Sequence, residues 1–299
     1  MQRIGFIGAS GMMGHGMARN LLAKGFALAI TVHRNHERIA DLLAAGATLA
    51  ATPAALARVS DTVFLCVTGS PQVEAAVTGP DGLLAGAASG LVIVDTSTAE
   101  PESTGKLRDL CAAQGVAYID APLARTPVEA EAGRLNVMVG ASDEHFAQLE
   151  PVLKAFAENV FHVGGPGAGH IIKLLNNFIA QASCTAVAEA FAVGQKAGID
   201  LKKLIALMSA GLVNSGLIQV MAKTLDGDLG GMKFALDNAR KDIRYYTHLA
   251  EGLGVPTVVG EGVHQSLALA CAMGFGDKYV PSLVEAQEKI TGVKIVPRG

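Results

Sequence analysis

The chain has 299 residues and a formal net charge of -3 at pH 7, so it has room for two domains but no excess of basic residues. Hydrophobic residues make up 50% of it, yet no run reaches the roughly 18 consecutive apolar residues that a membrane-spanning helix needs. Length, composition and charge therefore argue against a nucleic-acid partner and against a membrane span.

The cysteines are far apart and show no CxxC spacing: they are Cys66, Cys111, Cys184 and Cys271. Cysteines in apolar surroundings usually act as small core residues, so we expect neither a disulfide nor a metal site. A strand pattern begins at Arg3 and leaves no space for a cleavable signal sequence. We therefore expect a cytoplasmic protein.

Short apolar runs with β-branched residues alternate with segments of helical period in the first half of the chain. The runs occupy residues 4–7, 28–32, 63–67, 91–95, 117–120, 136–139 and 160–163. A helical segment is expected at 143–157, before the last of them. This alternation predicts a Rossmann-type α/β domain, with a doubly wound parallel sheet of about seven strands.

The pattern changes at Gly164, where the segment GGPGAG supplies turn residues. Helical period then extends over 170–197, and further helices are expected at 201–210, 234–252 and 256–272. No convincing strand pattern appears among them. We therefore predict a Rossmann domain over residues 1–163, followed by an all-α domain over 164–299 that begins with a long helix.

A glycine-rich loop joins the first strand to the first helix in the segment GFIGASGMMGHGMARNLLAKG. Its spacing is GxxGxxG, one residue longer in the loop than the usual GxGxxG. A backbone without side chains can approach a pyrophosphate, and the helix N-terminus stabilises its negative charge. We expect a dinucleotide to contact Gly8, Ser10, Gly11, Met12, Met13 and Gly14. The alternative is a tight turn that binds no ligand.

The residues after the second strand bear on which dinucleotide binds. An acidic side chain usually holds the adenine ribose of NAD about 20 residues beyond the glycines. Here the segment TVHRNH offers His33, Arg34 and Asn35 instead. Because a guanidinium at Arg34 can pair with a 2′-phosphate, we expect NADP(H) to be favoured over NAD(H). The alternative is that Arg34 is a solvated loop residue.

Longer motifs follow in a fixed order through nearly the whole chain. The glycine loop continues as MGHGMARNL, and the segments CVTGSPQVEAAV and DTSTAEP follow the third and fourth strands. Next come DAPLARTPVEAEAGRLNVMVG, GGPGAGHIIKLLNN and ARKDIRYYTHLAEGLGVP. Together they resemble the motifs of the β-hydroxyacid dehydrogenase family.

The resemblance implies an NAD(P)-dependent enzyme that forms a homodimer or homotetramer. Its substrate would be a small anionic 3-hydroxy acid or semialdehyde, of the 3-hydroxyisobutyrate, tartronate semialdehyde or sulfolactaldehyde type. By the same resemblance, cofactor contacts are expected from Val67, Thr68, Thr98 and Lys241, and Thr98 would also contact the substrate. The alternatives are a turn hydroxyl at Thr98 and a helix-surface charge at Lys241.

The resemblance also implies that Lys173 is the catalytic proton donor and acceptor, that Asn177 assists it and that Asn176 contacts the substrate. Helical spacing supports this independently, because residues three and four positions beyond Lys173 lie on its face of the helix. Such a polar cluster on an apolar helix needs water, a cofactor or a substrate. The alternative is an exposed lysine beside two solvated asparagines.

The chain departs from the family after its DAP segment, where the family usually has Ser-Gly-Gly and this sequence has Ala124, Arg125 and Thr126. In the family, backbone amides at this place grip the substrate carboxylate. Arg125 offers a full positive charge instead, able to form a forked pair with a carboxylate, sulfonate or phosphate. The Arg-Thr pair is similar to that of the branch that reduces sulfolactaldehyde, which favours a strongly anionic C3 to C4 aldehyde. The alternative is a structural Arg125 paired with Glu129 or Glu131.

Two other functions fit the same elements. Imine reductases have a similar architecture but lack a lysine at the position of Lys173, so this residue favours carbonyl chemistry. A dinucleotide-sensing module without activity would have no need of Lys173, Asn177 and Lys241 together.

Overall fold

The computed structural model describes residues 2–32 and 35–297. The chain divides into two compact units, Met1–Lys173 and Leu174–Gly299. The division falls inside α9 (Ala168–Lys196), the long helix expected after the glycine-rich turn. The boundary expected between residues 163 and 164 stays a prediction.

The first unit is built on a sheet with the strand order β3-β2-β1-β4-β5-β6-β8-β7, in which β9 also pairs with β8. The strands are β1 (Arg3–Ile7), β2 (Ala27–Thr31), β3 (Thr48–Leu49), β4 (Thr62–Leu65), β5 (Val92–Asp95), β6 (Ala117–Asp120), β7 (Leu123–Ala124), β8 (Leu135–Gly140) and β9 (Ala157–Gly164). All described neighbours run parallel except β8, which is antiparallel to β6 and β7. The predicted, mostly parallel α/β sheet is confirmed.

Helices cover both faces of this sheet. They are α1 (Gly14–Ala23), α2 (Ala40–Ala44), α3 (Pro53–Arg58), α4 (Ser70–Thr78), α5 (Leu83–Gly86), α6 (Pro101–Ala112), α7 (Pro127–Glu131) and α8 (Asp143–Leu153). Because successive strand residues point to opposite faces, Phe64 of β4 packs in one core with Met17 of α1. Its neighbours Val63 and Leu65 pack in a second core with Leu56 of α3. The sheet is therefore doubly wound, as predicted.

Two details of the first unit differ from the expectation. Strands β3 and β7 span two residues each, too few to produce a hydrophobic alternation in the sequence. The helix expected at 143–157 ends at Leu153, because the chain turns there and enters β9 at Ala157.

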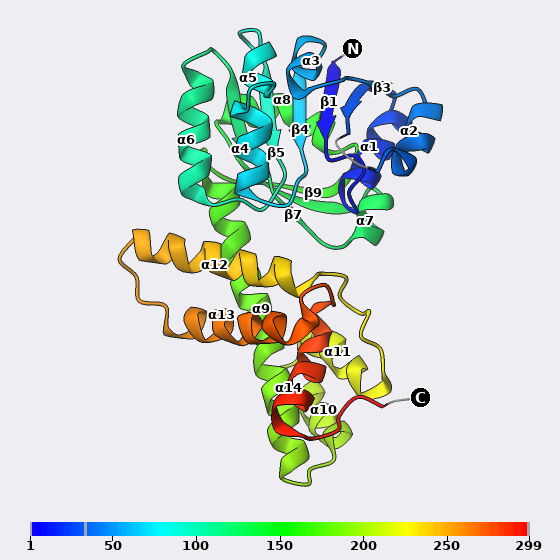
Figure 1. Cartoon of the computed structure of the whole chain (residues 1–299), viewed down its shortest axis with the longest axis vertical. Coiled ribbons are helices and arrows are strands. Elements are labelled where there is room, and N and C mark those ends of the chain that lie inside the picture. Colours follow the sequence, from blue (N-terminus) through cyan, green and yellow to red (C-terminus); the bar gives the residue numbers. More distant parts are fainter. Residues whose placement is uncertain (1, 33–34, 298–299) are drawn as a thin grey trace. The chain divides into compact units, whose positions relative to one another are not determined.

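The second unit contains helices and no named strand among its described residues, which confirms the all-α prediction (Figure 1). After α9 come α10 (Leu201–Ala210), α11 (Gly216–Ala222), α12 (Leu236–Gly252), α13 (Val258–Ala270) and α14 (Leu283–Thr291). Its core joins Phe191 of α9, Ile243 of α12, Leu267 of α13 and Val284 of α14. The short helices α11 and α14 were not predicted from the sequence.

Helix α9 is long and apolar enough, by length and composition alone, to cross a membrane. Within its most apolar window, 39% of the residues are buried inside the protein. Core helices of other proteins meet the same criteria, so the helix is weak evidence for a membrane span.

Candidate active site

Two glycines shape the loop between β1 and α1. Gly8 has a φ of 101°, in the left-handed region that favours glycine. A Cβ atom on Gly8 would lie 2.1 Å from the carbonyl oxygen of Cys66, just after β4, and one on Gly14 would lie 2.2 Å from the carbonyl oxygen of Gly8. Neither position can hold a larger residue, so the loop is a tight backbone turn against the end of β4.

The same loop contains backbone N–H groups that could donate hydrogen bonds to a ligand. The Gly11 N–H donates to the Gly8 carbonyl oxygen at 2.9 Å. Within the described ranges, no hydrogen bond takes up the backbone N–H groups of Ser10, Met12 or Met13. No acidic residue lies in the first turn of α1. A loop of this kind at a helix N-terminus fits the pyrophosphate of a dinucleotide.

Side-chain bonds hold the ends of β4 and β5 together beside this loop. The Val67 N–H donates to Ser97 Oγ at 3.0 Å, and the Thr96 hydroxyl donates to the Leu65 carbonyl oxygen at 2.6 Å. Thr68 is exposed and Thr98 is half-buried. Since β1, β4 and β5 are adjacent and parallel, the structure places Val67, Thr68 and Thr98 at the same edge of the sheet as the glycine loop. Ligands bind at this edge in open α/β sheets.

The loop expected to select the cofactor is only partly described. His33 and Arg34 lie outside the described residues, so the pairing of Arg34 with a 2′-phosphate stays a prediction. Asn35 is exposed and has a φ of 61° immediately before η1 (His36–Ile39).

His15, in the first turn of α1, is a residue that sequence reasoning missed. Its Nδ1 lies 2.8 Å from Glu131 Oε1 at the end of α7, and its Nε2 lies 3.1 Å from Asp41 in α2. Partial burial by itself lowers the pKa of His15, but the hydrogen bonds to Glu131 and Asp41 outweigh it and raise that pKa above 6.5. One imidazole therefore joins α1, the helix after the glycine loop, to α2 and α7.

Arg125 lies in the loop after β7 with a φ of 83°, an uncommon conformation for a residue other than glycine. Its Nη1 forms an ion pair with Glu158 of β9 and donates to the Arg134 carbonyl oxygen at 2.6 Å. Arg125 thus forms an ion pair, as the alternative expectation held, but its partner is Glu158 and neither Glu129 nor Glu131. The Glu129 carboxylate accepts from Thr126, and Glu131 pairs with His15 and Arg19. The partner of Arg125 comes from another strand, which sequence spacing does not reveal.

Thr126 and Ala124 each make a contact with a neighbouring helix or strand. Thr126 caps α7 through a capping box with Glu129, and Pro127 occupies the first turn. The hydrogen bond from the Thr126 hydroxyl lowers the pKa of Glu129, although slight burial opposes this. Ala124 pairs with Asn136 of β8. The three residues that replace Ser-Gly-Gly thus end one short strand and start one short helix.

Lys173 and the two asparagines follow one another along α9. Lys173 is half-buried and is the last residue of the first unit. In the second unit, Asn176 is exposed and donates its amide N–H to Asn177 Oδ1 at 3.2 Å, whereas Asn177 itself is buried. The helical spacing predicted for these residues is therefore present.

Asp242 of α12 is the second residue that sequence reasoning missed. It is 1% exposed, and its Oδ2 accepts a hydrogen bond of 2.6 Å from the Asn177 amide. Its Oδ1 lies 3.1 Å from the Lys241 Nζ, and this ammonium also lies 5.1 Å from the centre of the Tyr245 ring. The acid directly after the lysine in the segment RKD was the available sequence signal. A buried carboxylate thus orients Asn177 and pairs with Lys241.

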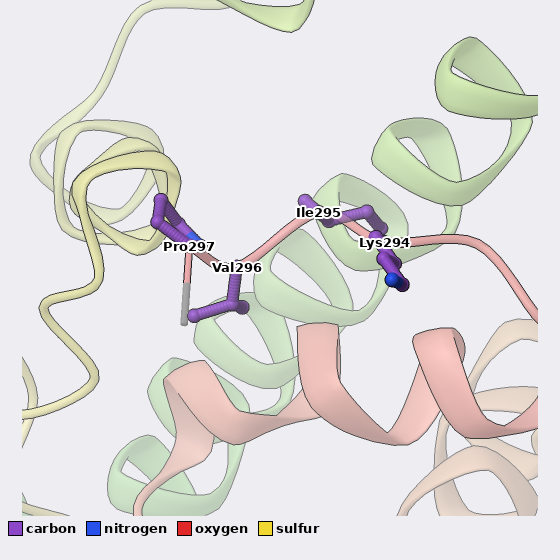
Figure 2. A pocket seen from close by; sticks show the side chains of 4 residues that line it. All are labelled: Lys294, Ile295, Val296 and Pro297. Carbon is purple, nitrogen blue, oxygen red and sulfur yellow. The ribbon is translucent and has the colours of Figure 1, made fainter. Parts of the chain in front are cut away.

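A hollow of about 180 Å³ on α12 is lined by three basic side chains, Arg240, Lys241 and Arg244, and by Asp237. A second hollow, of about 330 Å³, lies along the C-terminal segment from Lys294 to Pro297 (Figure 2). Its lining has Lys294 as its single titratable side chain, so it offers little chemistry. Among the described residues, no group of three or more His, Cys, Asp or Glu side chains could hold a metal ion.

Comparisons with known proteins agree with this arrangement. A family profile for the NAD-binding domain of 6-phosphogluconate dehydrogenase matches residues 3–164. A second profile, for the NAD-binding region of NADP-dependent 3-hydroxyisobutyrate dehydrogenase, matches residues 167–286.

Individual relatives match over nearly their whole length. The chain is 32% identical to a 2-(hydroxymethyl)glutarate dehydrogenase from Eubacterium barkeri, over 98% of this chain and 97% of the relative. It is 30% identical to a 3-sulfolactaldehyde reductase from Escherichia coli K12, over 95% of both proteins. A solved 3-hydroxyisobutyrate dehydrogenase from Salmonella typhimurium is similar in structure, with a TM-score of 0.82 and 28% identity over 95% of this chain and 99% of that one.

Proposed function

The chain belongs to the β-hydroxyacid dehydrogenase family of NAD(P)-dependent oxidoreductases, and from this premise we propose that it interconverts a small anionic semialdehyde and the matching 3-hydroxy acid. The observation that carries the proposal is the buried hydrogen bond of 2.6 Å from Asn177 to Asp242. Burying a carboxylate costs free energy even when it is paired, so a buried Asp242 that holds the Asn177 amide supports a functional need for the position of that amide. Asn177 lies one helical turn beyond Lys173.

Lys173 is the proposed acid and base. When bound, the reduced nicotinamide supplies the hydride that the carbonyl carbon accepts. The Lys173 ammonium donates a proton to the carbonyl oxygen as the alcohol forms, and in the oxidising direction its neutral amine takes the proton back. A positioned acid–base group of this kind is worth roughly 100- to 10,000-fold in rate.

Asn177 and Asp242 have supporting roles in this proposal. Asp242 accepts from the Asn177 amide nitrogen, so the carbonyl oxygen of the same side chain is turned to accept from Asn176 or from a substrate hydroxyl. The carboxylate also compensates the charge of Lys241, which we propose to contact the cofactor.

Arg125 is the proposed anchor for the substrate anion. Both of its contacts, to Glu158 and to the Arg134 carbonyl oxygen, are made by Nη1. In the described part of the chain, the Nε and Nη2 edge takes part in no hydrogen bond, and this edge has the fork geometry that matches a carboxylate or a sulfonate. The similarity to a sulfolactaldehyde reductase and to a dehydrogenase of a dicarboxylic acid supports a strongly anionic substrate.

A substrate panel tests the proposal. We expect NADPH-dependent reduction of sulfolactaldehyde, succinic semialdehyde, methylmalonate semialdehyde or tartronate semialdehyde, with propionaldehyde as an uncharged control that lacks the anionic group. A charge-assisted contact is worth about 1.5–3 kcal/mol, so kcat/KM for the preferred anion should exceed that for the control by ~10- to 100-fold. Arg125→Ala should remove this preference. Equal kcat/KM values for all aldehydes, or an unchanged Arg125→Ala variant, would contradict the anchor.

The preference for NADP(H) is a separate proposal that depends on Arg34. Arg34→Ala should raise the KM for NADPH by ~10-fold or more and leave the KM for NADH unchanged, because only NADPH carries the 2′-phosphate. A parallel rise for both cofactors would contradict this selectivity.

We also propose that the chain assembles as a homodimer or homotetramer. Large apolar side chains are exposed on α9 and α10, including Ile179 at 61%, Val193 at 69% and Leu207 at 73%. Exposed apolar surface of this kind marks interaction sites when it is contiguous. Light scattering coupled to size-exclusion chromatography should give a mass of two or four chains, and a monomeric mass at micromolar concentration would contradict the proposal.

A further inference from the structure

His170 is a fully buried imidazole at the start of α9, and the function proposed above does not use it. Its backbone N–H donates to Asp120 Oδ2 at 2.9 Å, and its Nδ1 lies 2.7 Å from Thr104 Oγ1. Its Nε2 lies 3.7 Å from Asp95 Oδ2. One residue therefore connects the helix start with β5, β6 and α6.

The Asp120 carboxylate caps α9 from outside the helix. It sits at the end of β6 and accepts from the N–H groups of Gly167 at 2.6 Å and of His170 at 2.9 Å. An acidic group at this place satisfies unpaired donors and stabilises the positive end of the helix dipole. A Cβ atom on Gly169 would lie 2.5 Å from the Met138 carbonyl oxygen, so the first turn of α9 packs directly on the sheet.

The imidazole fixes the rotation of that first turn. The Thr104 hydroxyl donates to the Glu100 carbonyl oxygen at 3.1 Å, so it accepts from His170, whose Nδ1 is then the donor. On its other side the ring faces Asp95, whose carboxylate is held by the Tyr118 hydroxyl at 2.7 Å and by the Ser97 N–H at 2.9 Å. The helix can neither rotate nor slide without breaking buried polar contacts.

We propose that His170 is a positioning residue for Lys173: it locks the first turn of α9 to the ends of β5 and β6, so that the ammonium three residues further on is held in the geometry of proton transfer. The inference depends on the proposed catalytic role of Lys173. Residues three positions apart lie on neighbouring parts of one helix face, so a rotation of the His170 turn moves Lys173 with it. A misplacement of about 1 Å can cost ~100-fold in rate.

A double-mutant cycle tests the proposal. His170→Ala should lower kcat by ~10- to 100-fold, with KM and the Kd for NADPH changed less than about threefold. In a Lys173→Ala background the same substitution should change the residual rate less than about twofold, because the group that it positions is already gone. His170→Gln, whose amide can still donate to Thr104, should recover most of kcat.

Two controls keep the outcomes distinct. Thr104→Val removes the acceptor while leaving the imidazole in place, so it tests the same contact if His170→Ala does not fold. His162→Gln changes a histidine of the same unit that contacts the Ala141 carbonyl oxygen, and it should leave kcat unchanged. Equal fold-losses with and without Lys173, or full kcat in both His170→Ala and Thr104→Val, would overturn the inference. A Lys173→Ala enzyme with full activity would instead refute the proposed function.

Discussion

His15 Nδ1 lies 2.8 Å from Glu131 Oε1, and this contact joins the helix that follows the glycine loop to the helix that follows the Arg125 loop. The other ring nitrogen lies 3.1 Å from Asp41 in α2, which follows the segment expected to select the cofactor. The three segments expected to surround the cofactor and the substrate are thus joined through one titratable side chain.

This contact predicts a pH-dependent stability. Although partial burial lowers the pKa of His15, its two carboxylate partners raise the pKa above the ordinary value of 6.5. A pKa raised by folding contributes stability that is complete below the unfolded-state pKa and is lost as the pH rises through the folded-state pKa. Wild type should therefore have a higher Tm than His15→Gln near pH 6, and the difference should shrink toward pH 9. A Tm difference that stays constant over this pH range would contradict a stabilising contact of protonated His15 with Glu131 and Asp41.

Asp242→Asn keeps the size of the side chain but removes its charge. The Asn177 amide then loses a charged acceptor and Lys241 loses its compensating carboxylate, so we expect a loss of ~1–3 kcal/mol in the free energy of unfolding. We also expect kcat to fall by ~10-fold or more, because the Asn177 orientation is no longer fixed. Glu251→Gln, at an exposed position near the end of the same helix, is the control for chemical denaturation and kinetics. Equal effects at both positions would count against a special role for Asp242.

Arg125→Gly separates backbone strain from anion binding. Glycine relieves a left-handed conformation that costs other residues about 1–2 kcal/mol, whereas the lost surface ion pair with Glu158 is worth only about 0–1 kcal/mol. The Tm should therefore stay unchanged or rise, while KM for an anionic aldehyde increases. A marked fall in Tm would contradict this and would mean that the ion pair of Arg125 with Glu158 stabilises the fold by more than the backbone conformation costs.

Two glycine substitutions should have opposite effects. Gly8→Ala brings a Cβ atom to within 2.1 Å of a backbone oxygen, so it should destabilise the first unit and abolish binding of NADPH. Gly105→Ala places a Cβ atom in open space within α6 and should stabilise the protein by about 0.5–1 kcal/mol. Thermal denaturation and a fluorescence titration with NADPH measure both. If Gly8→Ala bound NADPH as wild type does, the proposal that the dinucleotide lies against the backbone of the glycine loop would be contradicted.

The sequence predicted what depends on local periodicity and composition. The α/β unit, the helical unit and the helix that carries Lys173 were all expected, because buried strands and amphipathic helices produce patterns along the chain. The strands β3 and β7 were missed because two residues contain no pattern.

Side-chain partners from distant segments could not be predicted from spacing. Glu158 pairs with Arg125 across the sheet, and Asp242 contacts Asn177 from another helix. Both contacts depend on tertiary packing, which brings together residues that show no regular separation in the sequence. The segment RKD offered a signal for Asp242, but a charged pair on a helix is most often solvated.

The central claim is that Lys173 performs proton transfer rather than holding the fold or the cofactor. Its most direct test is to measure, on Lys173→Ala, both the Kd for NADPH and the rate of a single turnover with the preferred semialdehyde, using Lys196→Ala at the far end of α9 as a control. We predict that the Kd stays within about threefold of wild type while the rate falls by ~100- to 10,000-fold, and that the control changes neither. A Lys173→Ala rate close to that of wild type would contradict the account.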